Sequence, residues 1–263
     1  MNGRIFTIAG SDPSGGAGIQ ADIKTISALG GYAMAAITAL TVQNTVRVYD
    51  VHPVEAAMVS AQVTAVLEDM TPDAVKIGMM ATAGNVRQLA GIFSEYNDIP
   101  LILDPVILST SGHGMLESEG LEILIADLLP GLDVLTPNLA EAALIAGLDD
   151  IDSPSGMVRA GEKILSMGPK AVLVKGGHLP GDNVVDILIT EKETYEFSSP
   201  KIPTRNTHGT GCTLASAIAT GVGQGMQLED AVRRAHEYVH KAISEAPGYG
   251  SGKGPLNHSV ILD

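Results

Sequence analysis

Residues 206–213 read NTHGTGCT and place the single cysteine of the chain, Cys212, directly after a Gly-Thr-Gly turn. Gly209 and Gly211 allow the backbone to curl with its N–H groups pointing inward, and the small residues that follow are typical of a helix. A helix start binds phosphate oxygens, because it carries free N–H groups and partial positive charge. A thiol there is expected to have a lowered pKa and could take a proton from a group that attacks phosphorus. The pattern equally fits loop glycines beside a buried structural cysteine.

A second glycine-rich segment, residues 10–22, reads GSDPSGGAGIQAD and follows the first aliphatic run. It lacks both the Gly-Lys-Ser/Thr ending of a Walker motif and the spacing of a dinucleotide-binding fingerprint. Its small residues would let a flat ligand lie against the backbone. Asp22, about one turn into the next helix, could accept hydrogen bonds from ring or hydroxyl donors. The alternative is a flexible turn with Asp22 in solvent.

Two further candidate residues follow the second and third aliphatic runs. Gln43 carries an amide that donates and accepts, which matches the edge of an aminopyrimidine. Met79, with Met80 beside it, could form the floor of a pocket for an aromatic ring. A surface turn at Gln43 and ordinary core packing of the methionines remain the alternatives.

Charged and polar side chains follow the next three runs. Asn138 and Glu141 lie three residues apart at a helix start and share one face, and Glu141 with Asp104 could hold Mg²⁺ through its waters. Asn138 and Glu141 also fit a capping box, and both roles are compatible. Lys175 leaves a buried strand, where an unpaired charge is costly, so a nucleotide phosphate is the partner we expect.

The elements that must position these residues alternate along the chain. Short aliphatic runs predict buried parallel strands at residues 5–9, 35–40, 74–77, 101–103, 134–135 and 171–174. Helical patterns predict helices over residues 54–69, 83–96, 117–128, 138–146, 154–167, 211–224 and 228–245. An antiparallel hairpin is expected at 184–197. This order predicts an α/β fold, doubly wound, with a mostly parallel central sheet and helices on both faces, as a single domain over residues 1–263. Ligands of such sheets bind beyond the carboxyl ends of the strands, where the candidate residues lie.

Composition narrows the classes of partner. The formal net charge is -14, which disfavours nucleic acid and anionic lipid as partners. One cysteine cannot form an internal disulfide, and no apolar run approaches the ~20 residues that span a bilayer. The sequence therefore predicts a cytoplasmic protein without a membrane segment.

Taken together, these segments resemble the ribokinase superfamily along essentially the whole chain. Within it, the chain is most similar to the hydroxymethylpyrimidine and phosphomethylpyrimidine kinases of thiamine biosynthesis, for which residues 43–45 (QNT) and 209–212 (GTGC) are discriminating. The resemblance implies a ribokinase-like kinase that uses ATP and Mg²⁺. Its implied reactions convert 4-amino-5-hydroxymethyl-2-methylpyrimidine to the monophosphate and then to the diphosphate.

The resemblance also assigns residues. It implies that the pyrimidine is bound by Gln43 and Asp22, with three further residues around the ring: Ala17, Met79 and Val106. Cys212 stands where most superfamily members carry an aspartate base, and the transferring phosphoryl group would meet the N–H groups of Gly209, Thr210 and Gly211. The nucleotide is assigned to Lys175, Asn138 and Asp104, and Mg²⁺ to Glu141 and Asp104.

Other expectations concern assembly and rival functions. Family members are commonly dimers, so a homodimer is expected, and residues 248–256 resemble a segment that closes over the nucleotide, with a frayed tail as the alternative. A pyridoxal kinase of the same fold, or one bifunctional for both substrates, is the first rival, against which Gln43 argues. A non-catalytic pyrimidine-binding module is the second, and Lys175, Glu141 and Cys212 argue against it, because retention alone needs no base.

Overall fold

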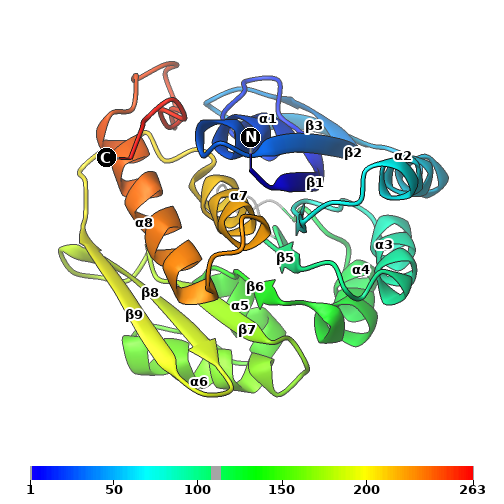
Figure 1. Ribbon diagram of the computed structural model, residues 1–263. Helices are drawn as coiled ribbons and strands as arrows, with labels where there is room; N and C mark the ends of the chain where they lie inside the picture. Colours follow the sequence, from blue (N-terminus) through cyan, green and yellow to red (C-terminus); the bar gives the residue numbers. More distant parts are fainter. Residues whose placement is uncertain (1, 108–113, 263) are drawn as a thin grey trace.

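The computed structural model describes residues 2–107 and 114–262. Within them, nine strands form one sheet in the order β3-β2-β1-β4-β5-β6-β7-β8-β9 (Figure 1). The strands are β1 (Arg4–Ser11), β2 (Tyr32–Gln43), β3 (Val48–Pro53), β4 (Ala74–Ile77), β5 (Leu101–Leu103), β6 (Val134–Leu135), β7 (Ala171–Lys175), β8 (Asn183–Thr190) and β9 (Thr194–Pro200).

The sheet is parallel in its centre and antiparallel at both edges. The six strands from β2 through β7 in this order pair in parallel, which confirms the mostly parallel sheet. The expected hairpin is present as β8 and β9. Strand β3, which pairs antiparallel with the end of β2, was not predicted, because its alternating polar residues give no continuous aliphatic run.

Helices cover both faces of the sheet, as predicted. One layer contains α1 (Gly18–Ala28), α7 (Thr210–Gly223) and α8 (Leu228–Ser244), and α7 packs between the other two (Figure 1). The other layer contains α2 (Ala56–Asp69), α3 (Ala83–Glu95), α4 (Ser118–Ile123), α5 (Leu139–Ala146) and α6 (Pro154–Leu165). The helix expected at 117–128 stays α-helical only as far as Ile123 and continues as a π-helical turn at Leu124–Leu128.

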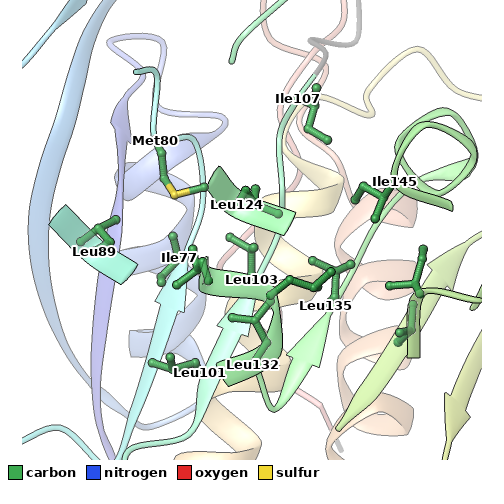
Figure 2. Packing of buried hydrophobic residues seen from close by; sticks show 14 of the residues in the cluster. Ile77, Met80, Leu89, Leu101, Leu103, Ile107, Leu124, Leu132, Leu135 and Ile145 are labelled. Carbon is green, nitrogen blue, oxygen red and sulfur yellow. The ribbon is translucent and has the colours of Figure 1, made fainter. Parts of the chain in front are cut away.

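Two hydrophobic clusters lie on the two faces of the sheet, because neighbouring residues of a strand point to opposite faces. Ile77, Leu103 and Leu135 lie in one row of the parallel register and belong to the cluster beneath α2 to α6. Figure 2 shows this row packed beside Leu124. Ile102, which faces the other way, belongs to the cluster beneath α7 and α8. Both faces of the short parallel strands are therefore buried, so a ligand approaches them beyond their carboxyl ends.

In the described part of the chain, no helix combines the length and the apolar character that crossing a lipid bilayer requires. That the whole chain forms a single domain stays a prediction.

Candidate active site

A cavity of about 640 Å³ lies at the carboxyl ends of the parallel strands. Its walls come from the segments that follow these strands and from the start of α7, while β8, β9 and α8 form one end. Twelve of the thirteen residues that the sequence assigned to the site line it: Ala17, Gln43, Met79, Asp104, Val106, Asn138, Glu141, Lys175, Gly209, Thr210, Gly211 and Cys212. The thirteenth, Asp22, does not.

The Gly-Thr-Gly turn forms the start of α7. Gly209 is the N-cap residue and has φ of 85°, a left-handed conformation that glycine adopts without strain. A Cβ atom at this position would also overlap the carbonyl oxygen of Gly16. The N–H of Thr213 donates to the Gly209 carbonyl at 2.9 Å, whereas no protein acceptor among the described residues meets the N–H groups of Gly211 and Cys212. These two groups are therefore available to an anion, whereas the N–H of Thr210, which was expected to join them, donates to the Thr207 carbonyl at 3.4 Å.

Asp12 organises the glycine-rich loop beside this turn. Its buried carboxylate accepts N–H groups from Ser14, Gly16 and Ala17, and His208 Nε2 lies 2.8 Å from its Oδ2. Burial acts to raise the pKa of Asp12, but the hydrogen bonds from His208, Gln43 and Ser14 outweigh it and hold this pKa well below its usual range. The Asp12 carboxylate thus remains charged and ties the loop to the Gly-Thr-Gly turn through His208.

Cys212 lines the cavity as predicted, but the expected lowering of its pKa is wrong. Burial raises the pKa of the thiol to about 11; the Lys76 ammonium opposes this shift, and the carboxylates of Asp22 and Asp104 add to it. Desolvation of the thiolate therefore outweighs the helix start. At neutral pH the side chain is a thiol, which can donate a weak hydrogen bond, and not a preformed base.

Asp22 is neither in solvent nor in the cavity, so its assignment to the pyrimidine is corrected. Its fully buried carboxylate pairs with Lys76, whose Nζ lies 3.0 and 2.9 Å from the two oxygens. Thr7 and Ser216 donate to it at 2.5 and 2.7 Å. Because Ser216 lies four residues after Cys212 on α7, this buried pair anchors the helix that carries the thiol.

One end of the cavity, here called the compact end, is lined by small, apolar and amide groups together with the charged Asp12 and Arg47. Gln43 ends β2, and a Cβ on Gly10 would overlap the Met79 side chain, so Met79 lies directly against the first loop. Met79 faces the cavity while Met80 belongs to the core, so each methionine has one of the two predicted roles. Val106 has φ of 39°, a rare conformation for a β-branched residue, and such strain is typical of functional sites.

A charged cluster occupies the middle of the cavity, opposite the Gly-Thr-Gly turn. Lys175 Nζ lies 2.7 Å from Asp104 Oδ1, so its anionic partner in this structure is a carboxylate, and the cost of burial does not by itself require a phosphate. Glu141 and Asn138 form the expected capping box of α5, and Glu141 also accepts the N–H of Ile107 at 3.1 Å. Burial raises the pKa of Glu141; the nearby Lys175 ammonium opposes this, and Asp104 adds to it.

The other end of the cavity contains residues that the sequence analysis did not single out. Asp186 on β8 accepts the N–H of Gly176 at 2.9 Å and faces His236 of α8, whose Nε2 lies 3.8 Å from Asp186 Oδ2. Val239, three residues after His236, lines the same end. Helical spacing places these two residues of α8 on one face, but nothing in the sequence indicates that this face meets the cavity.

Comparison with known proteins connects this geometry to a family. Residues 12–257 match the family described as phosphomethylpyrimidine kinase. A hydroxymethylpyrimidine/phosphomethylpyrimidine kinase of Rhizobium meliloti is 45% identical over 260 residues, which are 98% of this chain and 97% of that protein.

Two solved structures are similar to the chain. A phosphomethylpyrimidine kinase of Clostridium difficile has 42% identity and a TM-score of 0.81, covering 91% of this chain and 99% of its own. An ADP complex of Bacillus subtilis pyridoxal kinase has 32% identity and a TM-score of 0.91, covering 98% of both chains.

Proposed function

Since the chain belongs to the phosphomethylpyrimidine kinase family, we propose that it phosphorylates 4-amino-5-hydroxymethyl-2-methylpyrimidine with ATP, first to the monophosphate and then to the diphosphate. The observation that carries this proposal is the order of groups along one cavity. The end with Gln43 and the opposite end with His236 lie on either side of the free N–H groups at the start of α7. Two substrates entering from these ends would meet at the anion-binding turn.

We place the pyrimidine at the compact end. Gln43 offers a donor and an acceptor to the aminopyrimidine edge, and Ala17, Met79 and Val106 supply apolar surface around a ring. The hydroxymethyl group would then point toward Cys212. Asp22 contributes indirectly, by holding α7 through Ser216.

In the first phosphorylation, the hydroxymethyl oxygen attacks the γ-phosphorus, the bond from that phosphorus to the β,γ-bridging oxygen breaks, and ADP leaves. The N–H groups at the start of α7 and the Lys175 ammonium would stabilise charge on the transferring group. We propose that Cys212 orients the attacking hydroxyl as a thiol, and that the hydroxyl proton is lost late, to an oxygen of the transferred phosphoryl group and from there to water, as a loose transition state allows. In the second phosphorylation the acceptor is already a phosphate anion, with no hydroxyl proton to lose.

The residues present also fit Mg²⁺. Lys175 binds Asp104 Oδ1, while Asp104 Oδ2 points toward Gly211, and each oxygen of Glu141 accepts one main-chain N–H and keeps a further lone pair. No three His, Cys, Asp or Glu side chains gather in a metal-binding group in the described ranges, which suits an ion held by substrate phosphates and water. When bound, Mg²⁺ would supply positive charge to the phosphate oxygens.

The test is incubation with ATP, Mg²⁺ and the hydroxymethylpyrimidine, followed by mass analysis for mono- and diphosphate. Both products are expected, each dependent on ATP. Glu141→Gln serves as a comparison and is expected to lower the rate of both steps. Absence of any phosphorylated pyrimidine with wild-type protein would contradict the proposal and would favour a binding module.

Pyridoxal kinase activity is the alternative, and the high structural similarity to a pyridoxal kinase favours it. The Bacillus subtilis pyridoxal kinase has the higher TM-score, but the pyrimidine kinases have higher sequence identity, and we weigh identity more because the fold is common to both activities. We expect kcat/KM for the hydroxymethylpyrimidine to exceed that for pyridoxal. Equal or reversed values would make the chain bifunctional or a pyridoxal kinase.

We also propose a cytoplasmic homodimer. The outer end of β2 and the following loop expose apolar side chains, with Leu40, Val42 and Val46 each at least half accessible. Such an apolar patch, on β2 and the loop that leads to the edge strand β3, suits a second copy of the chain. Light scattering coupled to gel filtration is expected to give twice the chain mass of 27.2 kDa, and Val42→Glu to shift it toward the monomer.

A further inference from the structure

The segment after α8 joins two parts of the cavity wall that are distant in sequence. Residues 250–258 are called the strap here. The first residues of the strap contact the loop after β2. The N–H of Lys253 donates to the Thr45 carbonyl at 2.8 Å, and the N–H of Gly252 lies 3.3 Å from Thr45 Oγ1. A Cβ on Gly252 would overlap the Thr45 carbonyl oxygen, so the contact is as close as backbones allow. The strap is therefore docked at its beginning and is not a frayed tail.

The middle of the strap meets the turn before α7. The N–H of His208 donates to the Gly254 carbonyl at 3.0 Å, and His208 forms a parallel bridge with Pro255. His208 is also the residue that binds the Asp12 carboxylate. The strap, the glycine-rich loop and the Gly-Thr-Gly turn thus share one contact residue.

The end of the strap reaches the first turn of α7. His258 is buried, and its Nε2 lies 3.0 Å from Thr213 Oγ1. Tyr238 of α8 donates to the His258 carbonyl at 2.7 Å and fixes the strap against the helix layer. Thr213 directly follows Cys212, and its N–H closes the first turn onto Gly209. A displacement of the strap at Thr45 would therefore be transmitted to the anion-binding N–H groups.

We propose that the strap couples occupation of the compact end of the cavity to the geometry of the anion-binding turn, with Thr213 and His258 as positioning residues. The inference rests on the proposed function, because it takes residues 43–45 to be the pyrimidine end. A ligand that orders Thr45 stabilises the docked strap, and the docked strap holds the Gly211 and Cys212 N–H groups in place for a triphosphate. The coupling is reciprocal, so nucleotide must tighten pyrimidine binding by the same factor.

The test measures affinity of the full chain for the non-hydrolysable analogue AMP-PCP with and without saturating hydroxymethylpyrimidine. We expect the pyrimidine to tighten AMP-PCP binding about fivefold or more in the wild type. Gly252→Ala, which removes the space at Thr45, and Thr213→Val, which removes the hydroxyl that meets His258, should both bring this ratio close to one. Ser251→Ala, at the exposed neighbouring position, is the matched control and should keep the wild-type ratio.

A wild-type ratio of one, or an unchanged ratio in both Gly252→Ala and Thr213→Val, would overturn the inference. If AMP-PCP binds but the pyrimidine does not, the proposed substrate is wrong, and the strap is tested by hydrogen exchange of the ligand-free protein. There, Gly252→Ala is expected to speed exchange of the Thr213 amide about tenfold relative to Ser251→Ala, because the first turn loses its support. Equal exchange rates of the Thr213 amide in the two variants would contradict the proposed role of the strap, whatever the substrate is.

Discussion

Cys212 shows how strongly a local environment can reverse an expectation based on residue type and position. A helix start favours a thiolate, yet burial next to the carboxylates of Asp22 and Asp104 raises the thiol pKa to about 11. Lys76 lowers it, but this ammonium is already paired with Asp22. The thiol is therefore protonated at the pH of a cell and serves by position more than by charge.

We predict that Cys212 reacts slowly with iodoacetamide at neutral pH. Only the thiolate is nucleophilic, so the rate should rise about tenfold for each pH unit from 7 to 9.5 without a plateau. Because the chain has one cysteine, mass analysis of the alkylated protein reports this thiol alone. Asp22→Asn removes a neighbouring negative charge and should increase the rate at a given pH; a plateau below pH 8.5 in the wild type would contradict the raised pKa.

Cys212→Ala is predicted to impair the first phosphorylation more than the second. The first acceptor is a hydroxyl that the thiol orients, and loss of this orientation costs about 10²-fold. The second acceptor is already an anion, so a loss below about tenfold is expected. Separate steady-state assays starting from the alcohol and from the monophosphate measure the two effects, and equal losses would speak against this division.

At the residue scale, the sequence identified the cavity lining well and the buried support poorly. Gln43 and Met79 could be found because they follow strand runs, and strand ends in such a sheet converge, whereas Ala17 was assigned only through the family resemblance. The pairing of Asp22 with Lys76 could not be found, because these residues are 54 positions apart and meet only where α1 packs on β1 and β1 pairs with β4. A lysine within a buried strand is a signal, since its charge needs a partner, but the sequence does not say which one.

At the scale of elements, the start of α7 depends on a glycine for two separate reasons. Gly209 has a positive φ, and it also approaches the Gly16 carbonyl too closely for any Cβ. The strands and helices themselves were largely predictable from their periodicity. Strand β3 was not predicted because Asp50 and His52 interrupt its apolar residues, and the π-helical turn after α4 was not predicted because it keeps the apolar spacing of a helix.

We predict that Gly209→Ala lowers kcat about 10²-fold or more, because the shifted turn misplaces the anion-binding N–H groups. Gly225→Ala is the matched control: Gly225 follows α7, has φ of 84°, and has no atom within 4 Å of an added Cβ. Both variants should lose about 1–3 kcal/mol of unfolding free energy from the left-handed conformation. Kinetics and urea unfolding separate the effects, and similar kcat losses in the two variants would show that φ alone matters.

At the scale of the whole molecule, the acidic surface and the cavity have opposite tasks. The chain carries 16 basic and 30 acidic residues, yet the proposed substrates include a triphosphate. Lys175 and Arg47 line the cavity, and the N–H groups of α7 add partial positive charge without altering the net balance. Local backbone geometry can therefore provide anion affinity that composition does not indicate.

The stability of the whole fold is predicted to depend on pH through His258. Burial lowers the pKa of this histidine to about 4, so the unfolded chain takes up a proton near pH 6.5 while the folded chain does not. Above about pH 6.5 the ring is neutral in both states and folding is not opposed. Unfolding free energy is lost as the pH falls from about 6.5 to 4, by about 3 kcal/mol in total.

Urea unfolding of the wild type and of His258→Gln across this pH range isolates the contribution of His258, because every other titrating group is common to both proteins. His258→Gln should lose less stability on acidification than the wild type. If unfolding free energy fell equally with pH in the wild type and in His258→Gln, burial would not lower the pKa of His258. The contact between His258 and Thr213 would then persist when the imidazole is charged.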